Sequence, residues 1–437
     1  MVYKAKQAIL ILGDIFFLYF SLFLAIFIRY GSIGKAQLQI HLLPFSIVFI
    51  AWLIIFYVVG LFDIRNLKIN VFFIRRFLTG LALGVVASIA LFYLIPSFRI
   101  SPKTNLLIFS VIFCVFDFLW RWVLSRIIKS PFKTVLLIGN NLNANELKTY
   151  LSVNPQIGYK IQAHLSREEI SDHNDLSALI KNEKITTIVL SGRLNQEIFL
   201  SKLIFKNISL GIEVINFNDF YENVFGKIPL SELEESWFLE NITKRRKAYK
   251  IFKRVTDVFV GLIGLIITLP FYPFIALAIK LNSKGVVIYK QIRIGEKGKA
   301  FTNYKFRSMI SGPTQGWHTK NDKRITGVGK FLRRTHLDEL PQLINVLKGE
   351  ISFVGPRPDF VDFYENLNQT VPYYNIRTLV RPGMTGWAQV NYPITLSLEE
   401  TRERLAYDFY YLKNYSLILD LLIILKTVKT VLTASGA

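Results

Sequence analysis

The chain has 437 residues, 51% of them hydrophobic and 14% aromatic, and 53 Lys and Arg against 31 Asp and Glu give a formal net charge of +22. This apolar content excludes a disordered chain. The cationic excess, combined with a mean hydropathy of +0.35, argues against an ordinary cytosolic enzyme and favours nucleic acid or a membrane surface as partner. A single cysteine, Cys114, excludes a disulfide scaffold and a thiolate metal cluster.

The charge is unevenly divided along the chain. Residues 1–130 carry 13 basic and 3 acidic side chains, residues 131–240 carry 10 and 14, and residues 241–437 carry 30 and 14. Because an acidic segment separates two basic ones, we predict three domains with these bounds. The excess lies beside apolar stretches and in clusters suited to phosphate, so we expect no nucleic-acid partner.

Four apolar stretches fill the first segment, at about 8–28, 42–61, 77–95 and 106–124. Each is close to the roughly 20 residues that cross a bilayer as a helix, which predicts a four-helix transmembrane domain. Three charged side chains near or within them, Asp14, Asp117 and Arg121, are interpreted as facing a partner helix or the interface. Basic residues place both ends of this domain in the cytoplasm; they are Lys4, Lys6, Arg65, Lys68, Arg75, Arg76, Arg126, Lys129 and Lys133.

The second segment alternates strand and helix patterns. A buried-strand pattern at 134–139 is followed by a helical stretch at about 143–152 and by strand patterns at 185–191 and 212–216. This alternation predicts a small Rossmann-like α/β module. Its first turn offers one glycine, Gly139, where the dinucleotide-binding loop has three, so we expect a structural or regulatory module that is not catalytic.

The third segment begins with a basic run at 244–247 and continues with an apolar stretch, Val255–Ile279, which Pro270 and Pro273 interrupt. Proline breaks a helix, and basic residues on both flanks favour two cytoplasmic ends. We therefore predict a re-entrant helix that enters the inner leaflet, kinks at the prolines and returns; a buried apolar helix is the alternative. A later apolar stretch, 417–432, fits an interfacial or a packed terminal helix.

Short clusters rich in glycine and cations fill residues 285–395. Lys305 and Arg307 would share one face of a strand, with Phe306 turned to the core. Prolines on both sides of Arg357 stiffen its backbone, which suits an arginine aimed at phosphate. The cations with such settings are Arg293, Lys305, Arg307, Arg357 and Arg381.

An adjacent pair of carboxylates, Asp338 and Glu339, follows two arginines and His336. Such a pair on a helix is usually a solvated charge. Among cations, however, one carboxylate can bind a metal while the other acts as nucleophile or base. We interpret these residues and the surrounding cations as a diphosphate cradle around a carboxylate pair.

The third segment resembles the bacterial sugar transferase family, the monotopic polyprenyl-phosphate glycosyl-1-phosphate transferases, over about residues 249–433. Together with four spans and a Rossmann-like module, it resembles the larger members that start capsule, exopolysaccharide or O-antigen lipopolysaccharide units. Three positions depart from the family pattern: Leu269 where Ser precedes the proline, His336 where Ser or Thr is common, and Asp359 where Glu is common. The resemblance rests on Lys305-Phe-Arg-Ser-Met, Leu337-Asp-Glu-Leu-Pro-Gln, Asn345-Val-Leu-Lys-Gly, Val354-Gly-Pro-Arg-Pro and Arg381-Pro-Gly-Met-Thr-Gly-Trp-Ala-Gln-Val-Asn391.

The resemblance implies a phosphotransferase that passes a sugar 1-phosphate from a nucleoside diphosphate sugar, usually a UDP-sugar, to polyprenyl (undecaprenyl) phosphate and releases UMP. It implies Asp338 as the nucleophile of a phosphosugar-aspartate intermediate and Glu339 as a catalytic residue and Mg²⁺ ligand. The implied phosphate contacts are Arg293, Lys305, Arg307, Arg357 and Arg381.

The expected partners are the UDP-sugar, polyprenyl phosphate, membrane lipids and a second copy of the chain in a homodimer. The expected location is the bacterial inner (cytoplasmic) membrane, with several spans and with the catalytic domain on the cytoplasmic face.

Two other functions stay open at this point. A membrane-anchored nucleotide-sugar dehydratase also joins four spans to a Rossmann-type domain, but it needs a complete glycine loop and a Tyr-x-x-x-Lys pair, which the second segment lacks. A non-catalytic component of polysaccharide assembly or transport would leave the cation and carboxylate clusters unexplained. The sequence identifies neither the sugar nor the pathway.

Overall fold

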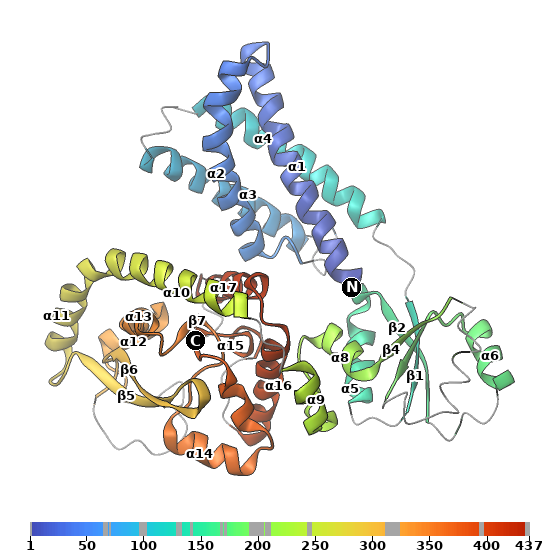
Figure 1. Ribbon diagram of the computed structural model, residues 1–437. Coiled ribbons are helices and arrows are strands. Elements are labelled where there is room, and N and C mark those ends of the chain that lie inside the picture. The colour runs from blue at the N-terminus through green and yellow to red at the C-terminus, as the bar shows by residue number, and fades with distance from the viewer. Residues whose placement is uncertain are drawn as a thin grey trace. The chain divides into compact units, whose positions relative to one another are not determined.

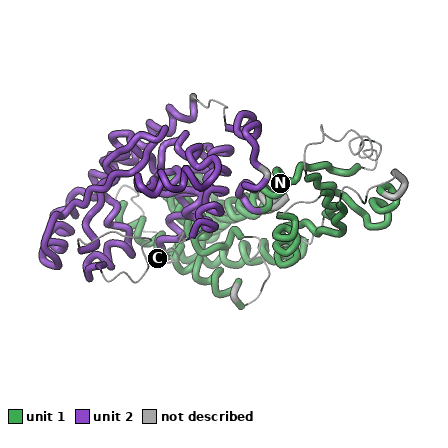
Figure 2. Tube along the Cα trace, turned by 90° about the horizontal axis from the view of Figure 1, so that it is seen from below, with its two compact units in different colours: residues 1–224 green, residues 225–437 purple. Residues whose placement is uncertain are grey.

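The computed structural model describes residues 2–63, 69, 71–95, 103–127, 133–139, 143–166, 169, 173–191, 205, 211–242, 247–310, 324–392 and 397–432. The chain forms two compact units, residues 1–224 and residues 225–437 (Figure 2). The three predicted domains divide the chain more finely, and their bounds stay a prediction. Residues 244–246 of the basic run and the predicted loop cations Arg65, Lys68 and Lys129 lie outside the described residues.

Four long apolar helices begin the first unit. Helix α1 packs against α4 and α2 packs against α3 (Figure 1). Their shared core is aromatic, and the buried Trp52 indole donates a hydrogen bond to Ser88 Oγ at 2.8 Å. Each helix is long and apolar enough to cross a membrane, which confirms four apolar helices here. Their bounds are α1 (Val2–Tyr30), α2 (Lys35–Val59), α3 (Val71–Leu94) and α4 (Lys103–Ile127).

The charged side chains inside this bundle bind one another. Arg121 on α4 forms an ion pair with Asp14 on α1, and its Nε donates to Asp117 Oδ2 at 2.9 Å. Its Nη1 also donates to the Leu61 carbonyl, just beyond α2, at 2.8 Å. All three charged side chains are fully buried, where charges persist only when they are paired. They therefore face partner helices, as expected.

A four-stranded parallel sheet follows in the order β2-β1-β3-β4. It confirms the predicted parallel-type α/β character, including the three predicted strands and the helix at 143–152. The edge strand β2 was not predicted, although its side chains alternate in burial. Residues 140–142 of the predicted glycine-poor turn lie outside the described part. The elements are β1 (Lys133–Ile138), α5 (Ala144–Val153), β2 (Tyr159–Leu165), α6 (His173–Asn182), β3 (Thr187–Leu190), β4 (Glu213–Asn216) and α8 (Phe217–Phe225).

The second unit is mostly helical, with an antiparallel pair β5-β6 and a parallel pair β7-β8. Its largest apolar core lies around Phe409 of α16, which is fully buried. The elements are α9 (Glu235–Asn241), α10 (Lys247–Thr268), α11 (Tyr272–Asn282), β5 (Ile288–Ile294), β6 (Ala300–Phe306), α12 (Gly327–Thr335), α13 (Gln342–Lys348), β7 (Ser352–Val354), α14 (Val361–Thr370), β8 (Gly383–Thr385), α15 (Trp387–Asn391), α16 (Leu398–Asn414) and α17 (Leu417–Leu432).

Helices α10 and α11 are one apolar segment broken at the predicted prolines. A 3₁₀ turn, Leu269–Phe271, separates them, because Pro270 cannot donate the backbone hydrogen bond that would continue α10. The two helices meet at a bend (Figure 1). At its base α10 is fixed by Arg254, which donates to the Val346 and Leu347 carbonyls at 2.6 and 2.7 Å. Most apolar side chains of α10 and α11 are exposed, among them Phe259, Ile266, Phe271, Phe274 and Leu281.

Two motif loops touch through their backbones where β7 pairs with β8. A Cβ added at Gly383 would lie 2.1 Å from the Gly355 nitrogen, and one added at Gly355 would lie 2.3 Å from the Arg381 carbonyl oxygen. The Gly355 N–H also donates to the Thr385 carbonyl at 2.9 Å. These glycines are therefore required by close approach, and they hold the loop of Arg357 beside that of Arg381.

We expect Gly383→Ala to lower the melting temperature of the purified protein, because its new methyl group meets backbone that cannot rotate away. Overpacking of this kind costs about 1 to 3 kcal/mol, and sometimes more. Gly327→Ala is the matched control, because its Cβ would meet nothing closer than 4.0 Å. Equal melting temperatures for the two variants would contradict the close backbone contact.

Candidate active site

The carboxylate pair lies in a tight turn. Asp338 and Glu339 belong to a 3₁₀ turn, Leu337–Glu339, between α12 and α13. His336 ends α12 in the left-handed region at φ 58°, which turns the chain sharply. As a result Asp338 is only 7% exposed. The pair therefore does not lie on a solvated helix face, the ordinary setting of such a sequence.

Glu339 is held ionised by two cations. Lys305, near the end of β6, donates to Glu339 Oε1 at 2.5 Å, and Arg357 Nη2 lies 3.9 Å from the same oxygen. Burial alone would raise the pKa of Glu339, but Lys305, Arg357 and the hydrogen bond from Lys305 together lower it to about 2. Glu339 is therefore a carboxylate at any physiological pH.

Asp338 is the less neutralised of the two carboxylates. Burial raises its pKa, Lys305 lowers it, and the neighbouring charge of Glu339 raises it again. Within the described part of the chain, no hydrogen bond to its side-chain oxygens is found. A buried carboxylate that no donor occupies is well suited to act as a nucleophile.

Two of the predicted phosphate contacts bind backbone carbonyls instead of pointing to the carboxylate pair. Arg307 donates to the carbonyls of Lys284 and Ser283 at 2.9 and 2.6 Å, just beyond the end of α11. Phe306 at the end of β6 is buried, as expected, and the Arg307 N–H continues the pairing with a hydrogen bond to the Val287 carbonyl at 2.9 Å. The charged ends of Lys305 and Arg307 nevertheless bind different partners, Glu339 and the carbonyls beyond α11. Arg307 thus fixes the broken apolar segment to β6, and its contact with phosphate stays a prediction.

Arg293 supports the loop that carries Arg357. Its Nη1 donates to the Pro358 carbonyl at 2.5 Å, and its guanidinium lies 4.3 Å from the centre of the Phe360 ring. Burial and the nearby Arg357 lower the pKa of Arg293 to about 10. A direct contact of Arg293 with phosphate stays a prediction.

Arg357 and Arg381 are the more open cations. Arg357 has 38% of its side chain exposed and lies beside Glu339. Arg381 Nε lies 3.2 Å from Glu296 Oε2, and both side chains are about one-third exposed. The structure thus brings together Asp338, Glu339, Lys305 and Arg357, while Arg381 is paired with an acid outside that group. Pro270 and Pro273 lie at the helix break.

A buried ion-pair network behind the Arg357 loop was missed by sequence reasoning. Arg377 donates from Nε to Asp408 Oδ2 at 3.0 Å, forms an ion pair with Asp359, and donates from Nη2 to the Arg357 carbonyl at 3.0 Å. Tyr374 completes it with a hydrogen bond to Asp359 at 2.9 Å. Because 31 residues separate Arg377 from Asp408, no local pattern connects them.

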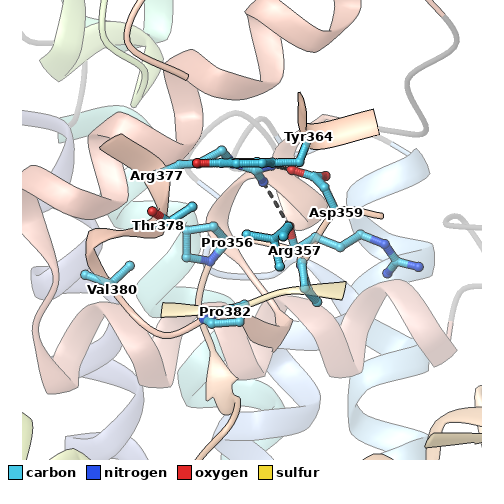
Figure 3. Close-up of a pocket in the computed structure, with 11 residues that line it drawn as sticks. Pro356, Arg357, Asp359, Tyr364, Arg377, Thr378, Val380 and Pro382 are labelled. Atoms are coloured by element: carbon cyan, nitrogen blue, oxygen red, sulfur yellow. Dashed lines mark hydrogen bonds and ion pairs between the residues drawn. The ribbon is translucent and has the colours of Figure 1, made fainter. Parts of the chain in front are cut away.

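Two residues of this network, Arg377 and Asp359, line a small cleft under the Arg357 loop. Arg377 lies along the cleft beside Asp359, whereas the Arg357 side chain extends away from Thr378 and Val380 (Figure 3).

The carboxylate pair offers oxygen ligands of the kind that a divalent metal uses. Among the described residues, no group of three or more His, Cys, Asp or Glu side chains gathers. Both cation contacts of Glu339 are to Oε1, which leaves Oε2 for another ligand. Mg²⁺ often uses one or two carboxylates together with substrate phosphates, so Glu339 with Asp338 alongside is a donor set that fits.

Comparison with known proteins identifies relatives that match between about two-fifths and four-fifths of this chain. The family model described as bacterial sugar transferase matches residues 248–434. A UDP-N-acetylgalactosamine-undecaprenyl-phosphate N-acetylgalactosaminephosphotransferase of Aeromonas hydrophila is 38% identical over 52% of this chain and 54% of its own length. A UDP-glucose:undecaprenyl-phosphate glucose-1-phosphate transferase of Klebsiella pneumoniae is 45% identical over 41% and 39%. An uncharacterized sugar transferase of Haemophilus influenzae is 30% identical over 78% of both chains.

The matched regions differ in extent. The chain covers about half or less of the Aeromonas and Klebsiella relatives, and about four-fifths of the Haemophilus relative. The carboxylate turn, the Arg357 loop and the network around Arg377 all lie within the residues that the family model matches.

Proposed function

Since the chain belongs to the bacterial sugar transferase family, we propose that it transfers a sugar 1-phosphate from a UDP-sugar to undecaprenyl phosphate and releases UMP. The names of the Aeromonas and Klebsiella relatives contain a UDP-sugar and undecaprenyl phosphate. The observation that carries the proposal is the buried, unbonded Asp338 beside a Glu339 that Lys305 and Arg357 keep ionised. This step would begin the synthesis of a cell-surface polysaccharide.

The reaction proceeds in two displacements at one phosphorus. An Asp338 oxygen attacks the phosphorus that bears the sugar, an O–P bond forms, and the P–O bond to UMP breaks with its electron pair on UMP. A phosphate oxygen of the lipid then attacks the same phosphorus, and the Asp338 carboxylate leaves with the pair that it had donated. Lys305 holds Glu339 in place, and Arg357 faces the negative charge that gathers on the phosphoryl oxygens.

We propose that Glu339 holds Mg²⁺ when the donor is bound. The ion would neutralise phosphoryl oxygens that otherwise repel the attacking carboxylate. The low pKa of Glu339 supports this role, because a metal ligand must be deprotonated.

We propose that α1 to α4 cross the bacterial inner membrane and that α10 and α11 form a re-entrant segment. The break at Pro270 and the exposed apolar side chains on both arms support entry from one side and return to it. A cytoplasmic site would then meet both the soluble donor and the lipid phosphate at the membrane surface. The homodimer stays a prediction that the mass of the protein in detergent would test.

A panel of UDP-sugars, assayed by UMP release, tests the function. We expect release with a preferred donor that requires both polyprenyl phosphate and Mg²⁺, stops with EDTA and returns when Mg²⁺ is added. The lipid product should carry one more phosphate than the acceptor. Repeated turnovers of UMP release in the absence of polyprenyl phosphate would contradict the proposal. Binding of the UDP-sugar without any release of UMP would contradict it as well.

A further inference from the structure

Asn345, in the middle of α13, is a fully buried amide that hydrogen-bonds through both its oxygen and its nitrogen. Its Oδ1 accepts from the Tyr304 N–H at 3.2 Å, and its Nδ2 donates to the Thr302 carbonyl at 2.7 Å. The same Nδ2 donates to Glu350 Oε2 at 2.6 Å. A buried amide is stable only when its donors and its acceptor are satisfied in this way.

These bonds occupy the edge of β6 that faces away from β5. In the described part of the chain, β6 pairs with one strand, β5. Alternate residues of a strand direct their N–H and C=O groups to the same edge, and Thr302 and Tyr304 are such a pair. The Asn345 side chain therefore takes the place of a peptide group in a neighbouring strand. An aspartate could not donate to the Thr302 carbonyl, so the contact requires an amide.

The same bonds connect the two elements that form the carboxylate site. Lys305 directly follows Tyr304 on β6, and Glu339 precedes Asn345 across the short turn that leads into α13. The 2.5 Å contact between Lys305 Nζ and Glu339 Oε1 therefore spans the two elements that Asn345 joins. The position of α13 against β6 determines whether Lys305 can reach Glu339.

Two other contacts hold α13, and neither binds it to the β6 backbone. Arg254 donates to carbonyls at the end of α13 and so fixes the helix to α10. Lys348 Nζ lies 3.4 Å from the Tyr304 hydroxyl, at the surface, where a long flexible side chain constrains its partner weakly. The buried Asn345 amide is therefore the contact that sets the distance between α13 and β6.

We propose that Asn345 is a positioning residue for the transfer reaction: by binding the β6 backbone it holds the Asp338–Glu339 turn where Lys305 reaches Glu339. This inference rests on the proposed function, because it assigns Asn345 a role in that reaction. Asn345 acts through the contact between Lys305 and Glu339, not on the substrate. A displacement of about 1 Å can lower the rate about a hundredfold even when its cause lies away from the reacting atoms.

The test measures turnover and the chemical labelling of Lys305 in Asn345→Ala. We expect kcat for UMP release to fall about ten- to a hundredfold, while the KM for the UDP-sugar stays within about threefold of the wild type. Without substrate, an acylating reagent should label Lys305 faster than in the wild type and approach the rate in Glu339→Gln, because the contact with Glu339 is lost. Lys290, an exposed lysine of β5, should be labelled at the wild-type rate. Mass spectrometry of peptides from the full chain in detergent reads both lysines.

Asn368→Ala, which changes an exposed asparagine of α14, is the matched control and should behave as the wild type in both measurements. Asn345→Asp is a second variant that keeps the shape of the side chain and loses the donor to the Thr302 carbonyl. It should change kcat and the labelling of Lys305 in the same direction as Asn345→Ala.

An unchanged kcat, or a lowered kcat with normal labelling of Lys305, would overturn the inference. Faster labelling of Lys305 and Lys290 alike in both Asn345 variants would also overturn it, since that result shows a general loss of structure. Failure of the proposed function is a different result: the wild type would release no UMP from any UDP-sugar, while the labelling of Lys305 would still show whether Asn345 holds the turn.

Discussion

Asp338→Asn is expected to reduce UMP release at least about a thousandfold, because an amide is a poor nucleophile and cannot form the phosphosugar bond. The substitution keeps the size of the side chain and removes its charge from a buried turn. Folding should therefore survive, and circular dichroism and the melting temperature should stay near those of the wild type. The measurement is the initial rate of UMP release with the preferred donor, Mg²⁺ and polyprenyl phosphate.

The control is Asp362→Asn, an exposed aspartate on α14, which should retain the wild-type rate. Donor binding provides a second readout, because an Asn at 338 still allows the cations and Glu339 to hold the diphosphate. Near-normal turnover by Asp338→Asn would exclude this residue as the nucleophile and leave it as a structural part of the turn.

The largest expected loss of stability belongs to Arg377→Met. This substitution leaves the carboxylates of Asp359 and Asp408 buried without their cation, which costs about 3 to 5 kcal/mol. For a domain of this size the melting temperature should fall by about 10 °C or more. The measurement is thermal unfolding in detergent, followed by tryptophan fluorescence.

A double variant separates charge from packing. The double variant Arg377→Met with Asp408→Asn should lose less stability than the sum of the losses of the two single variants. The reason is that the second substitution removes the Asp408 charge that the first leaves without a partner. Arg402→Met serves as the control for losing an arginine from the surface. A melting temperature within about 2 °C of the wild type for Arg377→Met would show that the network does not support the Arg357 loop.

Local patterns in the sequence predicted a large part of the fold. Apolar length gave the four N-terminal helices, and strand–helix alternation gave the parallel sheet. Pro270 marked the break between α10 and α11, because its missing N–H acts on the chain locally. The edge strand β2 was missed although its alternating pattern was available, since such a short stretch also fits a polar connection.

The candidate site was predicted in part. Asp338, Glu339, Lys305 and Arg357 come together, as the motif order suggested. The partners of Arg307 could not be predicted, because the Ser283 and Lys284 carbonyls that it binds lie more than 20 residues away in the sequence. Arg377 was missed because its partners, Asp359 and Asp408, are distant in sequence, and only packing shows that both carboxylates bind this arginine.

The most direct test is to trap the intermediate. Wild-type protein is mixed with Mg²⁺ and a UDP-sugar labelled in the sugar, without polyprenyl phosphate, and is then quenched and digested. We expect one labelled sugar phosphate on the peptide that contains Asp338, which disappears when polyprenyl phosphate is added before quenching. Rapid turnover with no label on the protein, or a label on a peptide without Asp338, would contradict the account.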